Sequence, residues 1–450
     1  MKSDTVAGGL QLRAAIVVSI LTTLATAAQA QEAFELPAQP ITEQPGLRLG
    51  TNIGAFWSDN IGRLAADEKS GTLGQVGVQL GYNERSRRLD ANADVNAAYQ
   101  HYFDNTFDDE VVGGINARAA LQLVPDRLRW LVQENFGQIN SDPFSASTPT
   151  NRENINYFTT GPELALRLGS VTSLRLAGYF SDTAYEVTDL DSRSYSGSAS
   201  LRRELSGASS LSLNATGEKI EFDNTVVNRD YDRYQAFLRY ELRGARTTLG
   251  VDGGYTQIDD NVKKSDGVLA RLSLSRRLSA SSTVSISAGS QFSAAGDLFR
   301  FDQQQRGVSL DSQSIIGASD AFKSRFASLG WGFDRNRTSL NLNVQYQDES
   351  YERSTTFDRT VTTYTGQLQR QISPITQLRL FAYLEREDFN NRNFTDDELQ
   401  VGLALERQLG RKLGVRLQYD YFDRDSSNSV SNYQENRIGV FLTWSPLARP

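Results

Sequence analysis

The sequence predicts an all-β protein, in which one antiparallel, up-and-down sheet of about 20 strands closes on itself as a transmembrane β-barrel. Three observations support this fold class. Apolar and polar residues alternate over segments of about ten residues along most of the chain. Short turns and longer polar loops connect these segments in alternation. The last segment, which ends on Trp444, alternates in the same way, and hardly any chain follows that could cover its apolar face.

The alternation is clearest in the stretch "SLNLNVQYQ" at 339–347. Leucine, valine and tyrosine occupy every second position there, and serine, asparagine and glutamine occupy the positions between them. A period of two gives the strand one apolar and one polar face. In a barrel the apolar face meets lipid, the polar face lines the lumen, and the last strand pairs with the first, at 47–57. This closure explains why the final strand needs no later cover.

The connections divide into nine tight turns and ten longer loops, which together join 20 strands, with 18 strands as an alternative count. Arginine and lysine collect in the tight turns, and aspartate collects in the longer loops. This alternation is typical of outer-membrane barrels, whose short turns face the periplasm. An even strand count then places both termini in the periplasm. The alternative, a secreted β-sandwich, does not predict such regular alternation of long and short connections.

The N-terminus predicts export across the inner membrane of a bacterium. Residues 1–30 contain Lys2 and Arg13, then an apolar run, then the triplet Ala28-Gln29-Ala30, which suits cleavage of a signal peptide. An uncleaved membrane anchor is the alternative. Residues 31–45 are acidic, contain proline and lack periodicity, so we expect a flexible periplasmic arm. The barrel itself is expected over 46–450.

Composition argues against several classes of function. The chain has no cysteine and one histidine, and its net charge is −7 without a basic tail, so we expect no enzyme, no metal site, no cofactor and no nucleic-acid partner. His101 is expected on the lipid face, as an interfacial structural residue. The stretch before Leu47 is too short for the plug domain of a TonB-dependent transporter, so none is expected.

The lumen is the predicted site, since its polar faces carry both signs of charge among many amides and hydroxyls. The longest loop, 293–322, has apolar residues of its own that suit folding back into the barrel. A position in the outer medium, against lipopolysaccharide, is the alternative. The pore-lining and constriction candidates are Arg233, Arg239, Arg271, Arg300, Asp302, Arg306, Asp311 and Arg416. The apolar anchors of the loop are Leu298, Phe299, Phe301, Ile315 and Ile316. The candidate membrane-interface anchors, expected near strand ends, are Tyr240, Tyr346, Tyr419 and Trp444.

Three stretches resemble a known family: "RENINYFTTGPELALRLGSVTSLRLAGYFSDTAYE" at 152–186, "DYDRYQAFLRYELRGARTTLGVDGGY" at 230–255 and "YQENRIGVFLTW" at 433–444. They are similar to the putative β-barrel porin 2 family, which includes outer-membrane barrels linked to exopolysaccharide and PEP-CTERM (exosortase) systems. The resemblance implies a porin that acts as a passive channel for exopolysaccharide or its fragments. Its implied partners are outer-membrane lipid and lipopolysaccharide, the barrel-assembly machinery and export components.

The alternative function is a structural or adhesive barrel that acts through its extracellular loops. One departure from the usual barrel pattern is that "SPLARP" follows the aromatic residue at the end of the final strand. The signal that the assembly machinery reads is therefore expected to lie inside the chain.

Overall fold

In the computed structural model, which describes residues 46–297, 299 and 316–445, the chain forms a single sheet of 20 β-strands. The strands are β1 (Gly46–Ser58), β2 (Gly71–Arg85), β3 (Leu89–Tyr102), β4 (Glu110–Val124), β5 (Leu128–Asn140), β6 (Arg152–Arg167), β7 (Thr172–Tyr185), β8 (Ser192–Glu204), β9 (Ser209–Phe222), β10 (Tyr231–Arg243), β11 (Thr247–Asp259), β12 (Lys264–Ser279), β13 (Ser282–Ser293), β14 (Phe322–Arg335), β15 (Thr338–Tyr351), β16 (Arg359–Ser373), β17 (Thr376–Phe389), β18 (Phe394–Gln408), β19 (Leu413–Ser426) and β20 (Tyr433–Trp444). No helix among these residues is long and apolar enough to cross a membrane.

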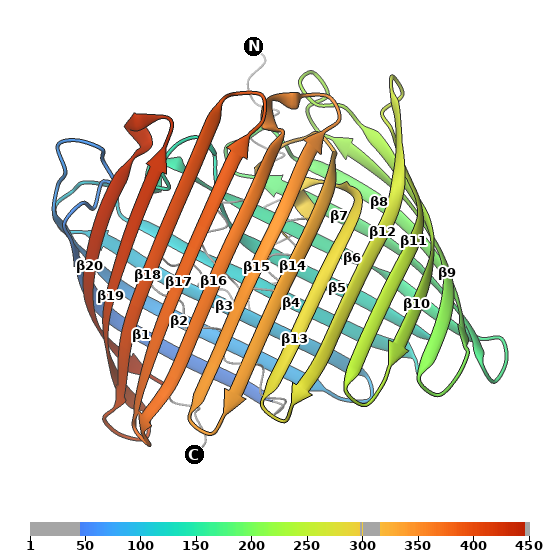
Figure 1. Cartoon of the computed structure of the whole chain (residues 1–450), viewed down its shortest axis with the longest axis horizontal. Coiled ribbons are helices and arrows are strands. Elements are labelled where there is room, and N and C mark those ends of the chain that lie inside the picture. Colours follow the sequence, from blue (N-terminus) through green and yellow to red (C-terminus); the bar gives the residue numbers. More distant parts are fainter. Residues whose placement is uncertain (1–45, 298, 300–315, 446–450) are drawn as a thin grey trace, which may run out of the picture.

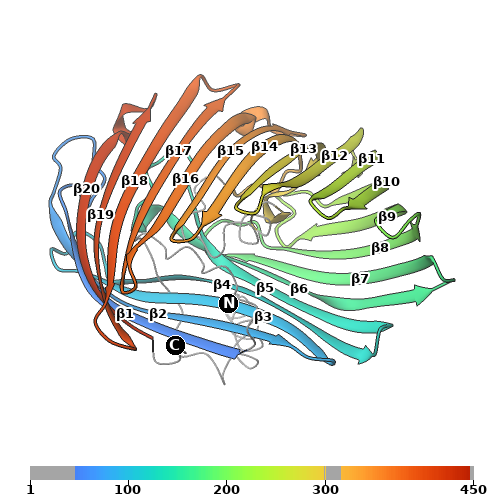
Figure 2. The same ribbon diagram turned by 60° about the horizontal axis from the view of Figure 1, so that its bottom comes forward.

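Each strand pairs antiparallel with its neighbours in the sequence, and the sheet closes where β1 meets β20 (Figures 1 and 2). The closing register runs from Thr51 opposite Trp444 to Ser58 opposite Arg437. Closure removes the free edges that an open sheet would expose. The predicted up-and-down barrel of about 20 strands is therefore confirmed.

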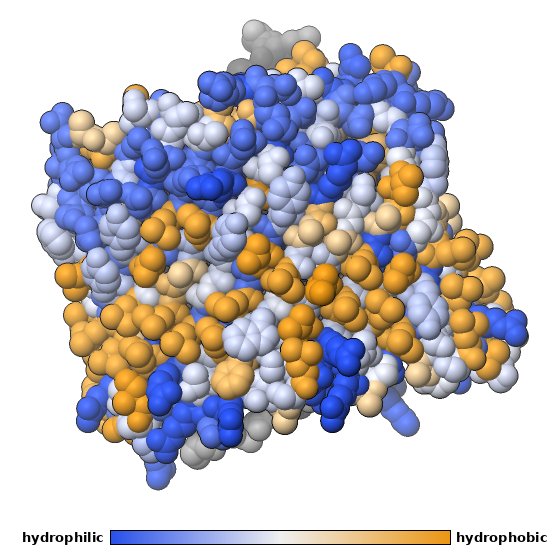
Figure 3. Space-filling model, in the orientation of Figure 1, coloured by the Kyte–Doolittle hydropathy of each residue, from blue (hydrophilic) through white to orange (hydrophobic). Residues whose placement is uncertain are grey.

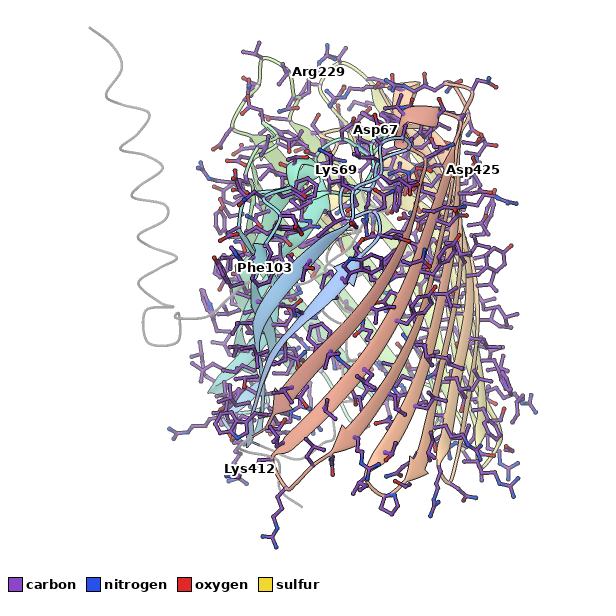
Figure 4. All side chains as sticks on the ribbon, turned by 90° about the vertical axis from the view of Figure 1, so that its left-hand side faces the viewer. Asp67, Lys69, Phe103, Arg229, Lys412 and Asp425 are labelled. Atoms are coloured by element: carbon purple, nitrogen blue, oxygen red, sulfur yellow. The ribbon has the colours of Figure 1, made fainter. Side chains whose placement is uncertain are left out.

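The long loops and the tight turns lie at opposite ends of the barrel (Figure 1). Figure 4 shows Asp67, Arg229 and Asp425 at the long-loop end and Lys412 at the tight-turn end. Three of the long loops contain short 3-10 helices, η1 (Pro149–Asn151), η2 (Thr355–Phe357) and η3 (Ser429–Ser431). The 20 strands are joined in chain order, as expected from the nine tight turns and ten longer loops of the sequence.

The side of the barrel that Figure 3 shows has an apolar belt, which lies nearer to the tight turns than to the long loops. On β15 the outward side chains are apolar from Leu340 to Tyr346 and become polar at Asp348. The strands contain 12 to 16 residues, whereas about 9–11 residues suffice to cross a bilayer. The strands therefore continue beyond the belt on the long-loop side.

The position of the apolar belt explains where the aromatic anchors lie along the strands. Trp444 and Tyr240 lie near the tight-turn ends of β20 and β10, as expected. Tyr346 and Tyr419 differ, because they lie in the middle of β15 and β19 rather than near strand ends. Both are exposed on the outer face, with 44% and 38% of their surface accessible. Their mid-strand position coincides with the upper border of the belt, since the strands extend past it.

Candidate functional site

The lumen-facing side chains follow the alternation that the sequence predicts. On β15, Leu342 and Val344 are exposed on the outer face, whereas Asn343 and Gln345 point inward and are half-buried. Cross-strand contacts agree, because the hydroxyls of Ser287 on β13 and Ser328 on β14 lie 2.6 Å apart on the inner face. The wall therefore has an apolar outer face and a polar inner face.

Two of the predicted basic residues form one cluster on β10–β12. The carboxylate of Asp252 accepts hydrogen bonds from Arg239 at 2.7 Å and from Arg271 at 2.7 Å. The Phe237 ring lies beside both guanidinium groups, 4.7 Å from that of Arg271. Arg271 also donates a 3.1 Å hydrogen bond to Gln291 on β13. The two arginines thus share a single carboxylate and leave this part of the lumen with a net positive charge.

The other two described candidates lie apart from this cluster. Arg233 donates a 3.1 Å hydrogen bond to Glu218 and also pairs with Asp297, which follows β13. Arg416 lies over the Phe441 ring at 4.7 Å, on the opposite wall. The structure therefore does not bring the four arginines together into one ring. The remaining candidates, Arg300, Asp302, Arg306 and Asp311, lie outside the described residues.

Ion pairs line the long-loop end of the lumen from β15 to β20, and no pattern in the sequence predicted them. Arg359 lies between Glu349 and Glu387, at 2.9 Å and 2.7 Å, and its side chain is fully buried. On β18 and β19, Asp396 pairs with Arg424, whose Nε lies 3.0 Å from the carboxylate. The two members of such a buried pair depend on each other, because loss of one leaves the charge of the other uncompensated.

The series of ion pairs continues to the seam of the barrel. On β20, Glu435 binds Arg437 at 2.7 Å and Arg63, from the β1–β2 loop, at 3.0 Å. Ser58, at the end of β1, donates a 2.6 Å hydrogen bond to the same carboxylate. These contacts join the last strand, the first strand and the first loop. The ion pairs therefore also stabilise the closure of the barrel between β20 and β1.

The β5–β6 loop (residues 141–151) crosses the long-loop end of the barrel and contacts strands far from its own. The Phe144 ring packs against Phe389 at 5.0 Å, Phe394 at 5.2 Å and Phe357 at 6.3 Å between ring centroids. The Arg392 guanidinium lies 4.3 Å from its centroid. These partners belong to the β15–β16 loop and to the β17–β18 hairpin. Phe144 therefore anchors the β5–β6 loop in an aromatic cage on another part of the rim.

Hydrogen bonds strengthen the same crossing. Arg424 donates to the carbonyl of Ser145 at 2.6 Å, Arg63 donates to that of Ser147 at 2.6 Å, and Ser431 donates to that of Phe144 at 3.1 Å. Both arginines also belong to the ion pairs of the rim. The only sequence signal for this loop is one large aromatic residue within an otherwise small and polar stretch, "SDPFSASTPT".

The flanks of the longest loop also turn into the lumen. Pairing between β12 and β13 ends at Ala270 and Ser290, although both strands continue. Beyond this point Phe292 is buried against lumen-facing residues of β9–β11, including Tyr231 and Ile258. The end of β13 therefore bends away from the wall and towards the interior.

Two of the five predicted apolar anchors of this loop lie among the described residues, and both are buried. Phe299 is fully buried against Ile139, Ile155 and Tyr157 on β5 and β6. Ile316 is 2% exposed. Leu298, Phe301 and Ile315 lie outside the described residues. The described flanks of the loop thus pack on the inner wall opposite their own strands.

His101 lies on the outer face, next to exposed Tyr99, as the sequence predicts. Its Nδ1 lies 2.8 Å from a carboxylate oxygen of Asp109, in the loop after β3. The hydrogen bond that the Tyr99 hydroxyl donates to Asp109 lowers the pKa of this carboxyl, and His101 acts in the same direction. Among the described residues no group of three or more acidic, histidine or cysteine side chains is placed to hold a metal ion.

The comparison with protein families bears on the C-terminal part of this barrel. Residues 313–445 match the family model described as putative beta-barrel porin 2. The matched region contains β14–β20, including the ion pairs of Arg359 and Arg424. The match confirms the resemblance to the porin family over this region, and the chain is a porin-like barrel of the outer-membrane type. No curated protein matches the chain.

Solved structures also match this chain, but their sequences are only distantly similar to it. A mutant of the ferric enterobactin receptor from Pseudomonas aeruginosa is 10% identical, with a TM-score of 0.49 over 89% of this chain and 81% of that one. The siderophore receptor PirA from the same organism is 13% identical, with a TM-score of 0.42 over 89% and 81%. The FrpB iron transporter from Neisseria meningitidis is 11% identical, with a TM-score of 0.43 over 88% and 81%.

Proposed function

We propose that this chain is a passive channel for hydrated polar solutes in a bacterial outer membrane. The observation that carries the proposal is the combination of a closed 20-strand wall, an apolar outer belt and a polar inner face. Barrels of 16–18 strands already enclose an aqueous channel, so a wall of this size has room for a solute path. The same features favour a transporter over an enzyme.

In the proposed orientation, the tight turns and both termini face the periplasm, and the long loops face the outside. Residues 1–30 then serve as the signal peptide and 31–45 as a periplasmic arm. The apolar belt supports this orientation, because the strands extend past it on the long-loop side. Lipopolysaccharide would contact the exposed polar surface above the belt, and the barrel-assembly machinery would insert the protein.

Restriction of the outer mouth is part of the proposal. The β5–β6 loop is anchored through Phe144, and the flanks of the longest loop pack inward through Phe299 and Ile316. Both features occupy the long-loop half of the barrel. A barrel this wide would otherwise leak small molecules, so loops that narrow it would preserve the membrane barrier while leaving a selective path.

The proposed cargo is exopolysaccharide or its fragments, with polysaccharide-export components as partners. Support comes from the family resemblance and from the many amide and hydroxyl groups of the lumen, which exchange hydrogen bonds readily with sugars. Secretion of exopolysaccharide by a deletion strain, with and without the restored gene, tests the cargo. Unchanged secretion would contradict it.

Planar-bilayer recording of the purified full chain tests the channel itself. Discrete single-channel steps are expected, and they should be absent from a heat-denatured sample. A folded, inserted barrel without any conductance would contradict the channel and favour the alternative function, a structural or adhesive barrel acting through its outer loops.

A further inference from the structure

One continuous part of the lumen wall, formed by β13–β16, has no charged side chains on its inner face. The inward residues over 285–291, 324–332, 341–347 and 363–369, all of them described, are serine, threonine, glycine, asparagine, glutamine and one phenylalanine. Yet 22% of the residues of the chain are charged. Charges on these strands either face outward, as in the pair of Arg325 and Asp348, or lie at the rim, as Glu349 and Arg359 do.

The remaining inner wall is different, because it carries ion pairs on most strands. Examples are the pairs of Arg129 with Glu163, Arg202 with Glu241, and Arg239 with Asp252. On the far side of the uncharged region, Arg379 and Glu406 form a 3.1 Å pair between β17 and β18. The lumen thus has one part without charges and one part with charges. The inward residues of β13–β16 in the ranges given are called the neutral wall, and the rest of the inner face is called the charged wall.

One aromatic ring belongs to the neutral wall, and a second borders it. Phe326 on β14 is opposite Gln347, and Phe381 on β17 is opposite Gln367. Both rings are half-buried, so part of each faces the lumen. Strands lie about 4.8 Å apart, so the two rings are about 14 Å apart across the strands. Along the strands they are a further six residues apart, or about 20 Å, because Phe326 lies at the level of Gln347 and Phe381 at the level of Asn341. Amide side chains, among them Gln345 and Gln367, occupy the wall between them.

The Phe326 ring lies along the wall rather than projecting from it. A Cβ atom added to Gly289, the residue opposite on β13, would lie 2.7 Å from the tip of this ring. The tip of the ring therefore covers the bare backbone of the glycine, and the half-buried side chain leaves part of the ring open to the lumen. A flat, apolar ring face next to hydrogen-bonding amides is suited to a pyranose ring, which has an apolar face and a hydroxyl-bearing edge.

We propose that the neutral wall is a binding track for neutral oligosaccharides. This inference rests on the proposed channel for its physiological role, and it deepens that role by naming the class of cargo. Amides and hydroxyls exchange hydrogen bonds with sugar hydroxyls at little net gain per bond, and the two aromatic rings add stacking. Each contact is weak, which allows a solute to enter and to leave. Charged glycans find no counter-charge on the wall itself, and cations reach only its borders, where Arg271 contacts Gln291 and Arg379 lies opposite Gln369.

The test measures binding directly, so that it does not depend on conductance. A fluorescently labelled neutral glucose oligosaccharide is titrated with the detergent-solubilised full chain, and the dissociation constant is obtained from anisotropy. A uronic-acid oligosaccharide of the same length is the comparison ligand. The neutral ligand is expected to bind at least about tenfold more tightly than the charged one. Equal affinities, or no binding of the neutral ligand, would overturn the proposal.

Variants then locate the site. Phe381→Ala is expected to weaken binding of the neutral oligosaccharide by about three- to tenfold, the range that one aromatic contact supplies. The double substitution Gln345→Glu and Gln367→Glu is expected to weaken it at least as much, because each carboxylate must lose water when a sugar covers it. Gln235→Glu, the same chemical change on inward-facing β10 of the charged wall, is the matched control and should leave the affinity unchanged.

All variants must show the heat-modifiable gel mobility of a folded barrel. If folded Phe381→Ala and the double variant bind as tightly as the unaltered protein, the neutral wall is not the site. If binding behaves as expected but bilayers show no conductance, the track stands and the proposed channel fails. If conductance is present without binding of the neutral ligand, the channel stands and the track fails.

Discussion

Phe144→Ala should release the β5–β6 loop from the rim of the barrel. Removing a fully buried phenylalanine costs about 3–5 kcal/mol, and Phe144 is half-buried. About half of that cost, or about 2 kcal/mol, is therefore expected. Because 1.4 kcal/mol corresponds to a factor of ten, the ratio of released to anchored loop should rise about 30-fold. The hydrogen bonds from Arg424 and Arg63 to the loop remain and keep the anchored form populated.

Limited proteolysis of the protein in liposomes measures this change, because cleavage of a transiently released loop follows its equilibrium population. Cleavage within 141–151 should accelerate by about 30-fold, and bilayer recordings should show more frequent states of larger conductance. Phe107→Ala is the control. Phe107 is a partly buried phenylalanine of the β3–β4 loop, and it packs on Tyr102 of its own hairpin. An unchanged cleavage rate in Phe144→Ala, or an equal increase in the control, would refute the anchoring role.

Three further predictions concern the wall. Val440→Arg places a charge on the apolar outer face, where the side chain is 51% exposed, and should cost about 2–4 kcal/mol, seen as weakened heat-modifiable mobility on gels. Cysteine in place of Asn343 should react with bulky aqueous thiol reagents, and cysteine in place of Leu342 should not; equal labelling would contradict the inward and outward assignment. Arg359→Ala leaves two buried carboxylates without their partner and should cost about 3–5 kcal/mol in urea unfolding, whereas Arg386→Ala, at an exposed pair, should cost far less.

The sequence was sufficient to predict the wall of the barrel. Residues two apart lie on the same face of any strand, so the segment at 339–347 revealed its own outer and inner faces without knowledge of its neighbours. Tight turns join strands that are adjacent in both sequence and space, so the number of strands and their order followed from counting the connections. The inward position of Arg233, Arg239 and Arg271 was predictable for the same reason.

The ion pairs of the rim were harder to predict from the sequence. Arg359 and Glu349 lie on adjacent strands, but their pairing depends on the register and on the exact level at which the loop begins. The aromatic anchors show a related limit. Tyr346 and Tyr419 were expected near strand ends, and only the full strand lengths revealed that the apolar belt covers one part of the wall.

The alternating wall, its strand order and the polarity of its inner face follow from the amino-acid sequence, because they depend on a local period of two and on short connections. The way in which the loops fill the long-loop end depends on contacts between distant segments of the folded chain. Phe144 meets Phe394 on a strand 250 residues later in the chain, and Phe299, which follows β13, packs on β5 and β6. Such contacts join segments that only closure of the barrel brings opposite each other, and no local pattern encodes which of the many exposed loop residues will meet.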